Sequence, residues 1–355
     1  MEQNLHQTQT VTVIALIIFA LIMIAIGIFS ARKTKTMDGF LLGGRKIGAW
    51  VSAFAYGTSY FSAVIFVGYA GQHGWNIGLG SIWIGIGNAI FGCLLAWMLL
   101  AKRTRTMTHT LKSKTMPEFF EGRFNSTKMK VFAAIIIFVF LVPYSAAVYK
   151  GLGSMFTTIF PTVSVNTWML VIAVLTAIYL VLGGYVATAY TDFVQGIIMI
   201  VGVFAMVVAI VKNPNVGGFS HFFSNLASVA DNGDKITGAQ LTSWYGGVNW
   251  KFLCVNILLT SFGTWGLPQM VSKYYAVKDI KSIHKATVIS TVFAIIVAGG
   301  CYFLGGFGRL YSDKIAINEA TGKPLFDTII PTMLSTLPAI VVAVVIVLVC
   351  LGGVA

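Results

Sequence analysis

Residues 54–64 read FAYGTSYFSAV and lie within an apolar run, residues 47–70, that is long enough to cross a bilayer as a helix. An ordinary membrane helix carries Leu, Ile or Val at its middle. This run carries small and polar residues there, namely Gly57, Thr58, Ser59 and Ser62. The stretch therefore predicts a helix that unwinds at mid-membrane and frees backbone groups to line a cavity or hold a ligand. A close contact between two helices, which small residues also permit, is the alternative that these residues leave open.

The composition predicts a polytopic helical membrane protein. The chain has 355 residues, of which 57% are hydrophobic and 10% charged, and its mean hydropathy is +0.84. Apolar runs of about 20 residues recur along it, and they predict nine spans, the last of them incomplete. The longest segment between spans, residues 212–250, is too short for a sizeable soluble domain. The chain stops inside an apolar run, LGGVA, so we expect a fragment of a longer protein.

The net charge of +13 follows from an uneven distribution of lysine and arginine. In the predicted topology, 17 of the 24 basic residues lie in loops on one side of the membrane, among them Lys273, Lys278, Lys281 and Lys285. The positive-inside rule makes those loops cytoplasmic and places the N-terminus outside. The charge is therefore explained by topology, and we expect a lipid bilayer rather than a nucleic acid as the partner.

A second glycine-broken span is predicted at residues 256–269, NILLTSFGTWGLPQ. Its small and polar residues fall at the middle of the span, as in the first one, but the predicted direction of the span is opposite. Opposite orientation at a matching position is the signature of an inverted repeat. We therefore expect an N-terminal anchor helix and basic loop (1–46), a first five-helix repeat (47–211), an outer loop (212–248) and an incomplete second repeat (249–355).

Asp192 is the one acidic residue of eleven that falls within a predicted span. A carboxylate in a membrane is costly unless it meets a cation, a cavity or a helix start. One reading places Asp192 on a sodium path, and the other makes it an N-cap or first-turn residue beside Thr191. We find no nucleophile–base pair and no metal-ligand spacing in the spans, so we expect no enzyme, no cofactor and no metal centre beyond sodium.

Four stretches carry a resemblance to a known family. They are GFLLGGRKIG (39–48), MPEFFEGRF (116–124), GGYVATAYTDFVQG (183–196) and GLPQMVSKYYA (266–276). In these stretches and their order the chain resembles the sodium:solute symporter family, which includes the sodium/proline, sodium/pantothenate and sodium/glucose transporters. The resemblance implies an all-α, five-plus-five inverted-repeat transporter fold with one extra N-terminal helix, whose second repeat is truncated here.

The resemblance also implies site residues. Sodium would be held by the carbonyls of Thr58 and Phe61, near Asp192, and by a hydroxyl pair that falls past Ala355. The residues expected at the solute are Ser59, Tyr60, Ser62, Tyr144, Thr260, Thr264 and Trp265. Two of them depart from the proline transporter, which has an aspartate at the position of Tyr60 and a tryptophan at that of Thr260. The pattern of Thr58, Tyr60 and Ser62 is closer to the pantothenate branch.

We therefore expect a sodium-coupled symporter of the cell membrane that imports a small organic solute, such as an amino acid, a carboxylate like pantothenate, or a sugar. Two alternatives share the fold. One is the transporter-like sensor domain of a longer signalling protein, and the other is a proton-coupled carrier, which would not need the hydroxyl pair.

Overall fold

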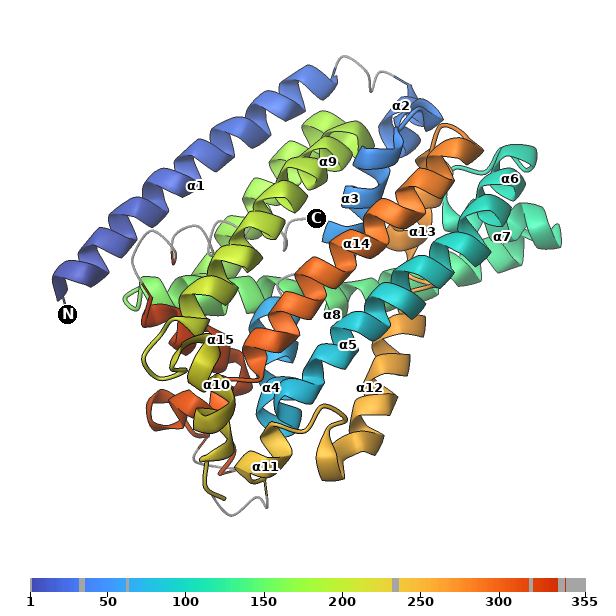
Figure 1. Ribbon diagram of the computed structural model, residues 1–355. Helices are drawn as coiled ribbons and strands as arrows, with labels where there is room; N and C mark the ends of the chain where they lie inside the picture. The colour runs from blue at the N-terminus through green and yellow to red at the C-terminus, as the bar shows by residue number, and fades with distance from the viewer. Residues whose placement is uncertain are drawn as a thin grey trace.

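The computed structural model describes residues 2–31, 36–61, 64–231, 236–318, 322–337 and 342, and nearly all regular structure in them is helical (Figure 1). The first half of the chain forms α1 (Glu2–Ala31), α2 (Met37–Leu42), η1 (Gly43–Arg45), α3 (Ala49–Tyr60), η2 (Val64–Tyr69), α4 (Ala70–Ile77), η3 (Gly78–Ser81), α5 (Ile82–Gly87), η4 (Asn88–Leu95), η5 (Trp97–Ala101), α6 (Lys102–Thr110), α7 (Met116–Phe124) and α8 (Thr127–Ile159). The second half forms α9 (Val165–Val211), α10 (Gly218–Ala227), α11 (Gly238–Leu241), η6 (Gly247–Asn249), α12 (Trp250–Phe262), α13 (Pro268–Ala276), α14 (Ile280–Gly305), η7 (Gly308–Lys314) and α15 (Phe326–Ser335).

Five helical segments of the described chain are long and apolar enough to cross a bilayer: Gln9–Ser30, Ala70–Thr110, Thr127–Ser154, Gly183–Val211 and Ile280–Gly305. They coincide with five of the nine predicted spans. A sixth predicted span corresponds to a shorter apolar helix, Val165–Ile178. The two glycine-broken spans are divided into pieces that are each too short, and the last predicted span, from residue 338, lies outside the described residues.

The double glycine at residues 183–184 interrupts α9, as the sequence predicts. Gly184 has φ 55° and ψ −157°, a backbone conformation that side chains with a Cβ rarely adopt. An added Cβ there would also lie 2.9 Å from the carbonyl oxygen of Phe40. The 47 residues of α9 are therefore two helices joined at a glycine turn that sits against α2.

Helix α14 is the centre of the protein and packs against α3, α4, α5, η4 and α9. Its closest approach is to α4, where an added Cβ on Gly74 would lie 1.9 Å from the backbone of Gly305. Small residues thus bring these two backbones into contact, which is a common way for membrane helices to pack. More than half of the α14 span is buried.

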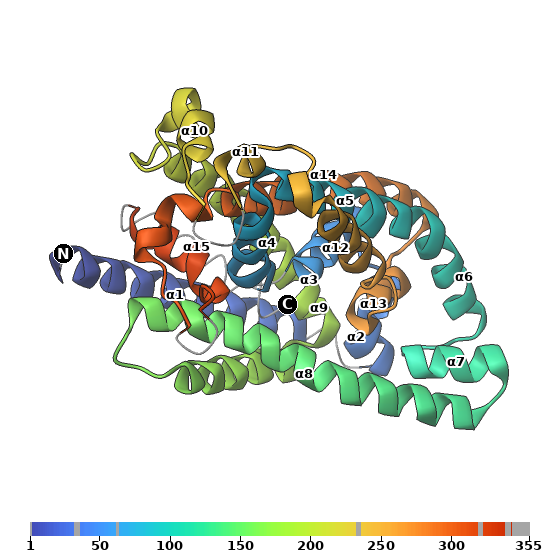
Figure 2. The ribbon, with the colours of Figure 1, turned by 90° about the horizontal axis from the view of Figure 1, so that it is seen from below.

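Helix α8 has the opposite character. Only 11% of its span is buried, and its exposed apolar side chains include Phe132, Phe138 and Phe140. Figure 2 shows α8 as a long helix along one face of the molecule, beside a part of α9, with which it makes its main contacts. An apolar face of this size on a spanning helix suits contact with lipid tails.

The segment 101–130, which connects two predicted spans and is rich in basic residues, is largely helical. It contains α6 and α7. The start of α7 is fixed by a capping box, in which the Thr115 hydroxyl accepts from the backbone N–H of Glu118 and the Glu118 carboxylate accepts from that of Thr115. Pro117 in the first turn favours the same start.

Candidate functional site

The first broken span is interrupted at Phe61, after the end of α3. Phe61 has φ −99° and ψ 66°, and its N–H makes the last hydrogen bond of the helix, to the carbonyl of Gly57 at 2.9 Å. The carbonyls in the last turn of a helix have no partner within that helix, and in α3 these are the carbonyls from Thr58 onward. The predicted break is therefore confirmed.

The helix nevertheless runs straight through Gly57, which does not unwind. An added Cβ on Gly57 would lie 2.3 Å from the ring of Phe293 in α14. At this position the alternative from the sequence, a close contact between helices, is correct. This stretch therefore combines both features: Gly57 lets the ring of Phe293 pack closely against the helix, and the helix ends four residues later, at Phe61.

The predicted sodium residues of this span are buried. The Thr58 hydroxyl donates to the carbonyl of Phe54 at 3.0 Å, which leaves the Thr58 carbonyl as its contribution to a site. Phe61 is fully buried, with its ring stacked on that of Tyr60 at 4.4 Å. The buried hydroxyl of Ser59 has no hydrogen-bond partner among the described residues. Ser62 lies outside the described residues.

The second broken span is interrupted as predicted. Helix α12 ends at Phe262, a turn occupies residues 263–266, and α13 begins at Pro268. The Tyr60 hydroxyl donates to the carbonyl of Thr260 at 2.8 Å. This bond joins the end of α3 to the end of α12, so the two broken spans meet at their interruptions.

Asn88 organises the polar groups at this meeting point. Its Oδ1 lies 2.8 Å from the Thr260 hydroxyl and 3.1 Å from that of Ser261, while its amide nitrogen is buried with no partner among the described residues. Nearby, the Thr264 hydroxyl donates to the Ser261 carbonyl at 2.8 Å. We call Tyr60, Asn88, Thr260, Ser261 and Thr264 the crossing cluster. It contains three of the predicted solute residues and is uncharged.

Trp265 lies beside the crossing cluster, with its indole N–H donating to the carbonyl of Phe91 at 3.0 Å. Tyr144 lies on α8 and is 36% exposed. The sequence analysis missed Asn88, although an amide in the apolar run of residues 82–101 is a detectable signal.

Asp192 is buried in the second half of α9 and forms an ion pair with Lys273 of α13. The Lys273 Nζ lies 2.9 Å from Asp192 Oδ2, and the two side chains are 6% and 1% exposed. Asp192 lies well inside the helix that starts after Gly184, so the reading as an N-cap is wrong. Lys273, predicted in a loop after the second broken span, lies in α13 instead, and its charge is neutralised inside the protein.

The surroundings of Asp192 contain further polar atoms without partners. Asp192 Oδ1, the Thr191 hydroxyl and both amide atoms of Gln195 are buried and make no hydrogen bond with any described residue. The same is true of Ser52 on α3, a helix that packs against α9. Buried polar groups are normally satisfied, so a group of unpaired oxygens indicates a place for a ligand, an ion or water.

The start of α3 and the end of α13 are tied together. Ile47, just before α3, pairs with Val277, just after α13, through the bonds Ile47 N–H to Ala276 carbonyl (3.1 Å) and Lys278 N–H to Ile47 carbonyl (3.1 Å). Arg105 of α6 donates to the carbonyls of Val277 (2.7 Å) and Lys278 (2.5 Å). We call this region, where η1, α6 and the end of α13 meet, the basic end.

Helix α14 starts at the basic end with an N-cap. The Ser282 N–H donates to the Asp279 carboxylate at 2.7 Å, and this bond holds the pKa of Asp279 below its usual value. The link between α13 and α14 is thus held by Arg105 at the carbonyls of Val277 and Lys278, and by the Asp279 cap at the start of α14.

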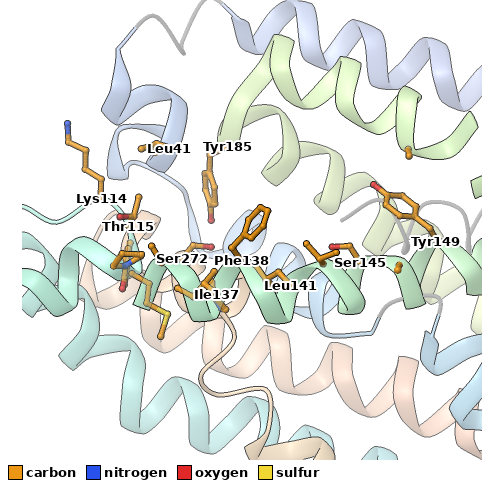
Figure 3. Close-up of a pocket in the computed structure, with 18 of the residues that line it drawn as sticks. Leu41, Lys114, Thr115, Ile137, Phe138, Leu141, Ser145, Tyr149, Tyr185 and Ser272 are labelled. Carbon is orange, nitrogen blue, oxygen red and sulfur yellow. The ribbon is translucent and has the colours of Figure 1, made fainter. Parts of the chain in front are cut away.

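A cavity of about 1110 Å³ opens between α8, α9 and α13 (Figure 3). Most of its lining residues are apolar, α8 contributes the largest share of them, and Tyr185, Ser272 and Tyr275 are among those that supply hydroxyl groups. In Figure 3, Tyr185 extends from α9 toward the side chains of α8. The hydroxyls of Tyr185 and Tyr275 are buried without partners among the described residues. The Lys273 Nζ lies 5.4 Å from the centre of the Tyr185 ring, so the cavity adjoins the buried ion pair.

The sequence matches curated transporters along most of its length. It is 29% identical to the osmoregulated proline transporter OpuE of Bacillus subtilis (strain 168), over 88% of this chain and 62% of that protein. It is 30% identical to the high-affinity proline transporter PutP of the same organism, over 87% and 64%, and 29% identical to a sodium/proline symporter of Salmonella typhimurium (strain LT2), over 81% and 55%. The chain therefore spans 55–64% of the length of these relatives.

The fold matches a solved structure, that of a Na+-coupled sialic acid symporter described as substrate-bound and outward-open. The TM-score is 0.77 at 16% identity, over 97% of this chain and 71% of the other. The model of the sodium:solute symporter family matches residues 40–353. These relatives are transporters and not enzymes. The chain belongs to the sodium:solute symporter family.

Proposed function

We propose that this chain forms the greater part of a sodium-coupled symporter that imports a small organic solute by alternating access. In this proposal, residues 47–211 and the residues from 249 onward are the two inverted repeats. The basic end faces the cytoplasm, since it carries most of the lysine and arginine, and the N-terminus lies outside. Two observations carry the proposal together: two interrupted helices meet at their interruptions, and α9, which packs against the first of them, holds a buried carboxylate whose Oδ1 has no partner among the described residues.

Sodium would be held between α3 and α9. A hard cation prefers oxygen ligands, and the structure offers the last-turn carbonyls of α3 and the free Oδ1 of Asp192. The carbonyls of Thr58 and Phe61 and the Asp192 carboxylate are the residues we propose for this role. The unpaired hydroxyls of Ser52 and Thr191 would supply further oxygens nearby.

The solute would lie at the crossing cluster, between Ser59 of α3 and Trp265. The amide nitrogen of Asn88 and the hydroxyl of Ser59 are its free hydrogen-bonding groups. Ser62 and Tyr144 stay predictions; Ser62 lies outside the described residues, and Tyr144 lies on α8.

Proline is the first solute to test, because the relatives are named as proline transporters. The crossing cluster adds a second candidate. It is uncharged, so it offers no carboxylate for the amino group of an amino acid, and the Tyr60 hydroxyl is already bonded to Thr260. A hydroxylated carboxylate such as pantothenate, or a sugar, fits these donors and acceptors as well as proline does.

Coupling follows from the shared use of α3. Its last turn would supply carbonyls to sodium, and its Ser59 and Tyr60 face the solute. An ion that fixes the end of α3 therefore favours solute binding, and by linkage the solute favours the ion equally. Movement of the two repeats relative to each other would then expose both to the other side of the membrane.

The test is solute uptake by the complete reading frame in proteoliposomes. Proline, pantothenate, glucose, sialic acid and short carboxylates are each compared with an inward sodium gradient and with choline in its place. We expect one solute to be taken up with sodium, and Asp192→Asn to reduce that uptake at least about tenfold, while Asp279→Asn at the exposed cap leaves it unchanged.

Uptake that follows a proton gradient instead would contradict sodium coupling and favour the proton-coupled carrier. Absence of driven uptake for every member of the panel would contradict symport of these solutes and favour the sensor. Size-exclusion profiles of each variant separate loss of function from loss of fold.

A further inference from the structure

The buried ion pair between Lys273 and Asp192 affects how sodium can bind at Asp192. Lys273 and Asp192 neutralise each other at 2.9 Å, and both are almost completely buried. A sodium ion added beside Asp192 would leave two positive charges on one carboxylate in a region of low dielectric, which is strongly unfavourable. Sodium held closely by this carboxylate would therefore weaken the attraction between the carboxylate and the ammonium group.

We propose that Lys273 is a tethered cation that occupies Asp192 in the absence of sodium and gives way when sodium binds. This inference rests on the proposed function and concerns the same site. A lysine suits the role because its ammonium is a compact charge on a flexible stem, so it can leave and return without movement of the backbone. The unpaired Oδ1 of Asp192 gives the entering ion a first contact before Lys273 has moved.

The structure also supplies a destination for the displaced ammonium. The Lys273 Nζ already lies 5.4 Å from the centre of the Tyr185 ring, and the face of an aromatic ring attracts a cation. Tyr185 lines the cavity together with Ser272 and Tyr275, which lie one residue before and two residues after Lys273 in α13. Two tyrosine hydroxyls there are unpaired and can accept hydrogen bonds from the ammonium.

The exchange would couple the ion to the second broken span. Lys273 belongs to α13, whereas Asp192 belongs to α9, so the pair joins these helices across 81 residues of sequence. When sodium takes over Asp192, this link is lost and α13 is held at its inner end by the pairing of Ile47 with Val277. Sodium would thereby loosen α13 from α9 while it fixes the end of α3.

The experiment measures sodium binding directly, as the rise of the thermal unfolding midpoint with sodium at constant ionic strength, with choline as the replacing cation. The complete reading frame is purified as wild type, Lys273→Gln and Lys273→Arg. The control is Lys278→Gln, which changes a half-exposed lysine at the same end of the molecule. Sodium-driven uptake is recorded in parallel.

We expect the half-saturating sodium concentration to fall at least about tenfold in Lys273→Gln, which corresponds to about 1.4 kcal/mol. In Lys273→Arg we expect it to rise, because a guanidinium binds a carboxylate through two hydrogen bonds and is harder to displace. Lys278→Gln should match the wild type. A half-saturating sodium concentration that rises from Lys273→Gln to the wild type to Lys273→Arg is the result expected of competition.

An unchanged or higher half-saturating concentration in Lys273→Gln would overturn the inference and leave Lys273 as a structural partner of Asp192. If Lys273→Gln does not fold, an unchanged or lower value in Lys273→Arg would overturn it equally. A wild type that shows neither sodium-dependent stabilisation nor sodium-driven uptake would refute the proposed function instead, so the two failures are distinguishable.

Discussion

Both broken spans carry a cluster of small and polar residues near their interruption, but the rest of the protein holds them in place differently. Every residue of α3 from Ser52 to Tyr60 is buried. In α12, which has 13 residues, only Leu253 and Ser261 are buried, and burial returns only after the break, in α13. The first broken span is thus enclosed by protein, whereas half of the second lies at the surface.

The difference teaches how each span is held. Helix α3 is fixed by packing against α9 and α14, so its position depends on many apolar contacts. Helix α12 also packs against α5 and η4, but its end is fixed by a few hydrogen bonds to Asn88 and Tyr60. Elements with few buried contacts open at low free energy. We therefore expect α12 to be the more mobile of the two.

The largest effect is expected from a methyl group added to the enclosed span. In Gly57→Ala, the new Cβ would meet the ring of Phe293 at 2.3 Å, so α3 and α14 must separate. We expect the free energy of unfolding to fall by about 2–3 kcal/mol. Chemical unfolding in detergent measures it. The matched control is Gly266→Ala in the second broken span, where a Cβ meets nothing within 4 Å. Equal losses in both would refute the comparison.

An intermediate effect is expected from Asn88→Ala, which removes the acceptor shared by the hydroxyls of Thr260 and Ser261. We expect the free energy of opening of α12 to fall by about 1–2 kcal/mol. Hydrogen–deuterium exchange of peptides from α12 and α3 measures it, and only α12 should exchange faster. Asn256→Ala, which changes an exposed amide on α12, should stay within about 0.5 kcal/mol of the wild type. Faster exchange in α3 alone would contradict our account of the anchoring.

The smallest effect is expected from Tyr60→Phe, which deletes the bond between the two broken spans and keeps the ring that stacks on Phe61. We expect a loss of about 1 kcal/mol in the free energy of unfolding. The double variant with Asn88→Ala tests whether the two bonds act on the same helix end. A coupling of at least about 0.5 kcal/mol is expected, and strict additivity would show that they act independently.

Local features of this chain could be predicted from the sequence because they depend on local chemistry. The clusters of small and polar residues near Gly57 and Gly263 predict both interruptions, and the double glycine at 183–184 predicts the turn in α9. The helix breaks at Phe61 and not at Gly57, because Gly57 fits against Phe293, a residue far away in sequence. The capping box at Thr115 is a local motif of the same kind, since its threonine and glutamate are three residues apart in the sequence.

The candidate site was predictable only in part, since its decisive contacts join distant segments. Asp192 was found as the one acidic residue in a span, but its partner could not be read from the sequence, because 81 residues separate it from Lys273. Lys273 follows the second interruption and looks like an ordinary residue of a basic loop. Only packing of α13 against its neighbours reveals that it is buried.

The bond between Tyr60 and Thr260 has a consequence for the biosynthesis of the protein. The two residues are 200 positions apart. At a translation rate of about 5–20 residues per second, the partner of Tyr60 is made roughly 10–40 s after Tyr60 itself. During that time α3, with its serines, its threonine and its interrupted end, has entered the insertion machinery without the helices that later enclose it. The first broken span must therefore wait at the translocon or in the lipid as an immature segment, and its final position is decided late in synthesis.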